Sequence, residues 1–96
     1  MTTLQNKDLF TPGTLVQHFK RETLSDEVLA AEPRMYLYEI VGIAEDTENG
    51  TDLMIYRALY GSQKMYARPL AMFLSPVDRE KYPDIRQEYR FAPAEM

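Results

Sequence analysis

The sequence predicts a mainly β fold, in the form of a small and strongly bent barrel of about five short strands. The strongest observation is the segment 53–73, which reads as two β-strands around a Gly61-Ser62 turn and closes at Pro69. A second long apolar segment covers residues 35–44, with turn-forming residues on either side. Closure into a barrel would also remove the exposed edges that a small open sheet leaves.

The expected strands share β-branched or aromatic content between turn signals: residues 14–20, 35–44, 53–60, 64–68 and 87–91. The fourth strand should end at Pro69, because proline cannot donate a ladder hydrogen bond. Asn49-Gly50 marks the turn before the third strand, although the loop around it is too long for a two-residue hairpin. The pattern therefore predicts about five short strands separated by turns, a longer loop and helical segments.

Two helical segments are expected between the strands. Residues 24–32 should form a short peripheral helix that starts after an N-cap at Thr23. Its apolar side chains recur at helical spacing and form a narrow stripe: Leu24, Val28 and Ala31. A helical turn over residues 76–82 is expected from Ser75 as N-cap and Pro76 at the first helical position.

The composition is that of a small globular protein with an acidic balance. The chain has 96 residues and a formal net charge of −4, which weighs against non-specific binding to nucleic-acid backbones. It contains no cysteine, which points to the cytoplasm and excludes thiolate nucleophiles. No segment approaches the roughly 20 apolar residues of a membrane helix, and no signal peptide is evident. We expect a frayed segment over residues 1–8, one domain over 9–92 and a tail over 93–96.

Several motifs occur in order along the chain: Pro12-Gly13 with His18-Phe19-Lys20, residues 38–44 with Thr47-Glu48, residues 55–60, Arg68-Pro69-Leu70 with Met72-Phe73, and Tyr89-Arg90-Phe91. Together they cover about residues 9–91 and resemble a bacterial family of uncharacterised domains, the domain of unknown function 1653. The resemblance implies an SH3-like barrel and no particular activity. Two features depart from the family pattern: residues 21–34 are an insertion, and Glu45 stands where a histidine is common.

The register of the hairpin over residues 53–68 decides which side chains share a face. A two-residue turn places Arg57 opposite Tyr66, and a three-residue turn places Tyr56 opposite Arg68. Turn chemistry favours the first register and hydrophobic patterning the second. We expect the second, with burial of an aliphatic face made of Leu53, Ile55, Leu59, Met65 and Ala67. The opposite face, called the tyrosine face below, then consists of Tyr56, Tyr60, Lys64, Tyr66 and Arg68.

The tyrosine face suits an anionic ligand, because tyrosine offers an apolar ring with a polar tip and arginine forks onto carboxylate or phosphate. The leading interpretation is a non-catalytic binding module for an anionic small ligand or a protein segment. Its expected ligand-binding residues are His18, Lys20, Glu48, Tyr56, Arg57, Tyr60, Tyr66 and Arg68. Two alternatives stay open: nucleotide or nucleic-acid binding by the same face, and a second minicore in which the tyrosines pack under the inserted helix while Arg68 pairs with Glu48 or Glu39.

A small enzyme built on His18 with Glu48 is a third and less favoured interpretation. His18 is the only histidine, so a histidine-rich metal site is impossible. The acidic residues of the segment 45–52 do not follow the spacing of a calcium-binding loop. We therefore expect no catalytic residue, no metal and no cofactor.

Overall fold

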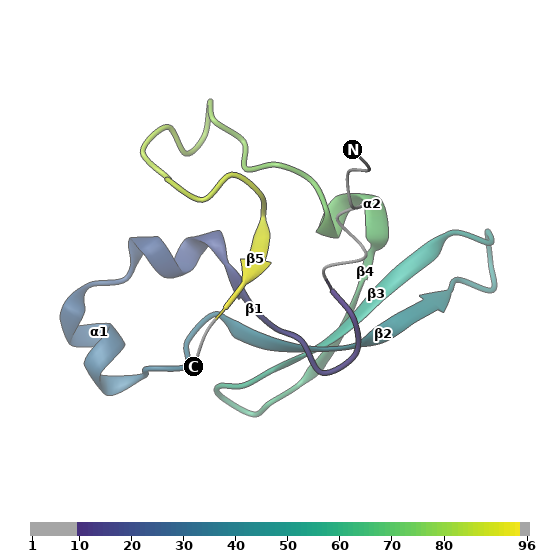
Figure 1. Ribbon diagram of the computed structural model, residues 1–96, viewed down its shortest axis with the longest axis horizontal. Helices are drawn as coiled ribbons and strands as arrows, with labels where there is room; N and C mark the ends of the chain where they lie inside the picture. The colour runs from purple at the N-terminus through teal and green to yellow at the C-terminus, as the bar shows by residue number, and fades with distance from the viewer. Residues whose placement is uncertain (1–9, 95–96) are drawn as a thin grey trace, which may run out of the picture.

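The computed structural model describes residues 10–94 and shows a mainly β protein with two short α-helices (Figure 1). The strands are β1 (Leu15–His18), β2 (Leu37–Glu45), β3 (Asp52–Ala58), β4 (Met65–Pro69) and β5 (Phe91–Pro93). The helical elements are the 3-10 helix η2 (Phe19–Thr23), α1 (Asp26–Ala31) and α2 (Leu70–Phe73). The segment 1–8, expected to be frayed, lies outside the described residues. No helix within residues 10–94 is long and apolar enough to cross a membrane.

The five strands form one antiparallel sheet in the order β4-β3-β2-β1-β5. Within residues 10–94 the edge strands β4 and β5 do not pair with each other, so the sheet stays open and the expected SH3-like barrel is not confirmed. The sheet is bent, however, at a register shift between Ile40 and Gly42 of β2. As a result, the guanidinium of Arg68 on β4 lies 5.9 Å from the centre of the Phe91 ring on β5.

Neither register expected for the β3–β4 hairpin was right. Tyr56 lies opposite Tyr66, and Arg57 lies opposite Met65. The turn is longer than expected: the N–H of Gln63 donates to the carbonyl of Tyr60 at 3.1 Å, and both Gly61 and Gln63 have positive φ. The favoured register placed Tyr56 opposite Arg68, and the observed partner, Tyr66, lies two positions earlier in the chain. A shift of two residues leaves every side chain on its original face. The division into two faces is therefore kept.

The buried side of the sheet is the tyrosine face, so the expectation that the aliphatic face forms the core was wrong. Tyr56 is buried, whereas Met65 on the aliphatic face is 61% exposed. The aromatic rings occupy the core because each buries a large apolar area and their hydroxyl groups can form hydrogen bonds there. Tyr38 and Tyr60 share a hydrogen bond of 2.7 Å between their hydroxyls. The buried side chains of this core are Phe10, Val16, Tyr38, Ile40, Met54, Tyr56, Ala58, Phe73 and Phe91.

The helix that covers the tyrosines in the structure is α2 and not the inserted helix α1. The N-cap of α1 is Ser25, whose hydroxyl accepts from the N–H of Val28, and not Thr23. No residue of α1 is buried, so this helix is peripheral, as expected, and does not cover the tyrosines. The cover comes from α2, because its residue Phe73 is fully buried and stacks on Phe91 with ring centres 4.1 Å apart.

Residues 75–90 form an irregular loop above β1 and η2 (Figure 1). The helical turn expected over 76–82 is absent, because Pro76 instead forms an isolated β-bridge with Tyr89. One helix-like hydrogen bond remains, from the N–H of Tyr82 to the carbonyl of Asp78 at 2.8 Å. The closing strand expected over 87–91 begins only at Phe91.

Candidate functional site

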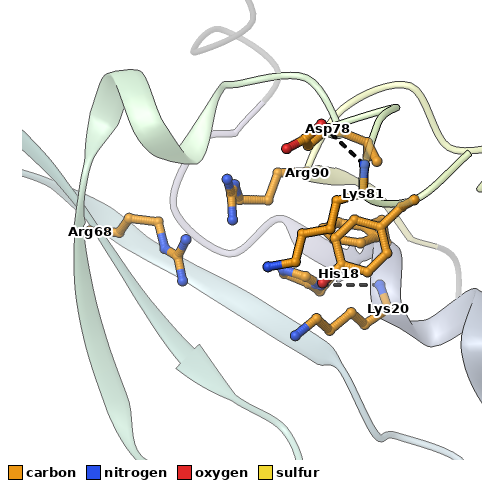
Figure 2. A pocket seen from close by; sticks show the side chains of 9 residues that line it. His18, Lys20, Arg68, Asp78, Lys81 and Arg90 are labelled. Carbon is orange, nitrogen blue, oxygen red and sulfur yellow. Dashed lines mark hydrogen bonds between the residues drawn. The ribbon is translucent and has the colours of Figure 1, made fainter.

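A pocket of about 290 Å³ lies where β1 passes into η2, between β4 and the 75–90 loop (Figure 2). We call it the His18 pocket. Its lining residues come from four separate segments of the chain: His18, Phe19, Lys20, Arg68, Val77, Asp78, Lys81, Tyr82 and Arg90. The bend of the sheet is what brings the β4 edge close to the residues that precede β5.

The His18 pocket concentrates positive charge in an acidic protein. Figure 2 shows Lys20, Arg68, Lys81 and Arg90 extending from different sides toward the space beside His18. The salt bridge seen within residues 10–94 joins Arg57 to Glu39 and uses none of these four cations. These four positive side chains therefore lie close together, and none of them forms a salt bridge with a carboxylate among the described residues.

The acid in the pocket lining, Asp78, is occupied by the backbone. Its Oδ1 accepts hydrogen bonds from the N–H of Glu80 at 3.0 Å and from the N–H of Lys81 at 3.3 Å. This is the local pattern by which aspartate stabilises a turn. Asp78 therefore positions Lys81 through its backbone and forms no ion pair with it.

Both arginines of the pocket are oriented through Nε by neutral hydroxyl groups. The Nε of Arg68 donates to the Tyr56 hydroxyl at 3.2 Å, and the Nε of Arg90 donates to the Ser75 hydroxyl at 3.2 Å. The terminal NH₂ groups of the two guanidiniums have no partner within residues 10–94. A guanidinium held in this way keeps its charge and its two-pronged donor geometry for an external anion.

His18 is buried at the base of the pocket, with 9% of its surface exposed. Its Nδ1 accepts a hydrogen bond from the N–H of Lys20 at 3.1 Å, which assigns the ring proton to Nε2. Burial, together with the positive charges of Arg68, Arg90 and Lys20, lowers the pKa of His18 from 6.5 to about 4. At neutral pH the imidazole is therefore uncharged and offers Nε2–H as a donor.

One wall of the pocket is apolar. Phe19 and Val77 are buried there together with Ile85, and Tyr82 packs against this cluster. The ring centres of Phe19 and Tyr82 are 4.8 Å apart in an edge-to-face arrangement. The pocket thus combines several cationic donors with a small aromatic surface.

The 75–90 loop is held in place although it lacks regular structure. The carboxylate of Glu22 in η2 accepts from the N–H of Arg86 at 2.9 Å and from the N–H of Gln87 at 2.7 Å. The N–H of Arg90 donates to the carbonyl of Ser75 at 2.9 Å. These contacts fix the loop near both ends, including the backbone of Arg90, while the backbone of Lys81 is held by Asp78.

The structure brings together three of the residues expected to bind a ligand, namely His18, Lys20 and Arg68. Tyr56 does not line the pocket but supports it from the core, because its hydroxyl accepts from Arg68. Tyr60 is half-buried and bonded to Tyr38.

The remaining expected residues lie elsewhere. Tyr66 is 42% exposed on the edge strand and does not line the pocket. Arg57 is on the opposite face of the sheet, with its Nη2 atom 2.5 Å from Oε1 of Glu39. Glu48 is exposed in the β2–β3 loop, at the far end of the molecule from η2, so it cannot act together with His18 (Figure 1).

Sequence reasoning missed Lys81 and Arg90. Lys81 fell within the helical turn expected over 76–82, and Arg90 within the closing strand expected over 87–91. The Tyr89-Arg90-Phe91 motif marked the right segment, but nothing local connects it to His18. Among the described residues, no group of three or more histidine, aspartate or glutamate side chains could hold a metal ion.

The fold and this pocket define a small mainly β domain with a preformed cationic site. The sequence model of the family described as "Protein of unknown function (DUF1653)" matches residues 14–93, and the chain therefore belongs to that family. All nine pocket-lining residues fall inside the matched range. No curated protein and no solved structure shows significant similarity to the chain.

Proposed function

We propose that the protein is a non-catalytic binding module that holds a small anionic ligand in the His18 pocket. One observation supports this above the others: four cationic side chains surround a neutral imidazole, and no described carboxylate pairs with them. Like charges gathered in a partly desolvated site repel one another, and an anion would relieve that repulsion. The family resemblance and the lack of cysteine make the bacterial cytoplasm our proposed location.

The size of the pocket favours a small molecule over a polymer. About 290 Å³ lies at the lower end of the range in which small-molecule sites fall, roughly 300–1,000 Å³. Binding of single-stranded nucleic acid requires open aromatic faces for base stacking. Of the tyrosines considered for stacking, Tyr56 is buried and Tyr60 is half-buried, and the more exposed Tyr66 lies outside the pocket. A small anion is therefore a better fit than nucleic acid.

The hydrogen bonds of His18 argue against a catalytic role. A general base must present an unprotonated nitrogen to its substrate. With Nδ1 occupied by the Lys20 N–H, the nitrogen left for a ligand is the protonated Nε2. His18 then serves as a hydrogen-bond donor to the anion.

The proposal predicts that removing a pocket arginine weakens anion binding without unfolding the protein. Arg90→Gln should weaken binding of sulfate or phosphate by at least about tenfold, and the free energy of unfolding should change by no more than about 1 kcal/mol. Arg34→Gln is the matched control, because Arg34 is exposed and outside the pocket but carries the same charge.

Binding is followed by the NMR signals of the His18 ring, which need no assignment because the chain has one histidine. Anion-induced stabilisation is measured in parallel by thermal shift, since a ligand that binds only the native state raises its midpoint. The proposal is wrong if no anion moves the His18 signals, or if Arg34→Gln weakens binding as much as Arg90→Gln does.

A further inference from the structure

We infer that the ligand of the His18 pocket carries a terminal phosphoryl group, as a phosphate monoester does. This inference rests on the proposed function and specifies its ligand class. It is drawn from three features of the pocket: the directions of its donors, the sum of its charges and the apolar wall beside them.

The donors of the pocket approach from several directions. Arg68 comes from β4, Lys20 from η2, Lys81 from the 75–90 loop and Arg90 from the residue before β5 (Figure 2). A carboxylate has two oxygens in one plane and is satisfied by a single guanidinium fork. A terminal phosphoryl group presents three strong acceptor oxygens in a tetrahedral arrangement. Two oriented guanidiniums, two ammonium groups and an imidazole N–H match the tetrahedral group better.

The positive charge of the pocket also favours an anion with two negative charges over one with a single charge. Four cations surround a neutral His18, and the carboxylate of Asp78 accepts hydrogen bonds from backbone N–H groups. A carboxylate or a phosphodiester would bring about one negative charge, whereas a phosphate monoester brings about −1.5 to −2 near neutral pH. The larger charge compensates more of the repulsion among the four cations.

The apolar wall gives the organic part of the ligand a place to lie. Phe19, Val77 and Tyr82 line the same pocket as the cations. The Nζ of Lys81 lies 5.7 Å from the centre of the Tyr82 ring, so charge and aromatic surface are adjacent. A compact ester with its phosphoryl group among the cations could place its carbon part against Tyr82. Free inorganic phosphate would use the cations alone.

The test measures affinities of the full chain for inorganic phosphate, phenyl phosphate, dimethyl phosphate, acetate and sulfate, by titration of the His18 ring signals. We expect phenyl phosphate to bind at least about tenfold more tightly than dimethyl phosphate or acetate at about pH 7.5. Its affinity should fall by about tenfold at about pH 5, because the second phosphate proton is then bound. Sulfate is the control: it stays a tetrahedral dianion at both pH values, so a change in its affinity reports on the protein.

The variant Tyr82→Ala distinguishes an ester from free phosphate as the ligand. Because Tyr82 also lies beside the Lys81 ammonium, both affinities can fall, but the affinity for phenyl phosphate should fall by roughly three- to tenfold more than that for inorganic phosphate. Equal loss for both would overturn the placement of an organic group on the apolar wall.

The outcomes separate this inference from the proposed function. If acetate or dimethyl phosphate binds as tightly as phenyl phosphate, the pocket still binds anions but the phosphoryl inference is wrong. The same holds if the affinity for phenyl phosphate does not rise between about pH 5 and pH 7.5 relative to sulfate. If none of the anions moves the His18 signals, the proposed function fails as well.

Discussion

Two arginines on neighbouring strands show how the same side chain takes two roles in this protein. Arg57 on β3 lies on the aliphatic face, and its guanidinium pairs with the carboxylate of Glu39 on β2. Arg68 on β4 lies on the tyrosine face, where its Nε donates to the neutral hydroxyl of Tyr56. The guanidinium of Arg57 is therefore already paired within the protein. Arg68 keeps its charge and the donors of its terminal NH₂ groups, and it lines the His18 pocket.

The contrast between the arginines follows from the faces that they occupy. Around Tyr56 the tyrosine face is buried beneath Phe73 of α2 and Phe91 of β5, and the half-buried Arg68 is held there through its Nε by the Tyr56 hydroxyl. The aliphatic face is half-open: the side chains of Arg57 and Glu39 are 41% and 33% exposed. A pair with that exposure contributes little to stability, because water screens it. Burial therefore decides both where the core is and where a binding site can form.

The largest expected effect tests the assignment of the buried face. Phe73→Ala should lower the free energy of unfolding by about 3–5 kcal/mol, because Phe73 is fully buried and stacks on Phe91. Met72→Ala is the matched control in the same helix, where the side chain is 51% exposed, and should change stability by less than about 0.5 kcal/mol. Urea denaturation measures both. If Phe73→Ala does not fold, Phe73→Leu should still be clearly less stable than Met72→Ala, and equal stability of the two would contradict the assignment.

A smaller effect compares the two arginines through their partners. Tyr56→Phe removes the hydroxyl that orients Arg68, and should cost about 0.5–1.5 kcal/mol of stability. We expect the affinity for sulfate to fall by roughly three- to tenfold, since the guanidinium is less well held. Glu39→Gln breaks the pair with Arg57 and should leave sulfate affinity unchanged, with a stability change of about 0–1 kcal/mol. Unequal stability losses alone would not support the comparison. The comparison of the two arginines is supported only if the affinity for sulfate falls in Tyr56→Phe and not in Glu39→Gln.

A third test concerns the pH dependence of stability. The pKa of His18 is about 4 in the folded protein and 6.5 as a free side chain. Between these values the unfolded chain binds more protons than the folded one, so the free energy of unfolding falls as pH decreases from about 6.5 to about 4. This contribution is fully present above pH 6.5. The carboxylates also titrate in the lower part of this range, so the effect is measured as a difference between wild type and a variant.

The variant for this measurement is His18→Asn, whose side-chain oxygen can replace Nδ1 as the acceptor for the Lys20 N–H. Stability should decline less steeply in His18→Asn than in the wild type between pH 6.5 and pH 4. Identical slopes for the two proteins would show that His18 titrates normally and is not desolvated in the pocket.

Local sequence signals predicted the β-strands, the peripheral helix and three of the nine residues that line the pocket. The hairpin segments around Asn49-Gly50 and Gly61-Ser62 carry their strand and turn chemistry within a few residues, so their existence could be read directly. His18, Lys20 and Arg68 were identified as candidate ligand-binding residues and do meet in one pocket. The helical turn at 76–82 failed because its proline is bridged to Tyr89, a contact 13 positions away along the chain.

What the sequence by itself determined is the division of β3 and β4 into two faces, because alternation along a strand is a local property. Which of the two faces is buried was decided only by the tertiary structure. Both faces are apolar enough to form a core, and the choice depends on Tyr38, Phe73 and Phe91, which arrive from other parts of the chain. The same holds for the pocket. Lys81 and Arg90 reach His18 only because the sheet bends and Glu22 holds the 75–90 loop, and no local pattern encodes those long-range contacts.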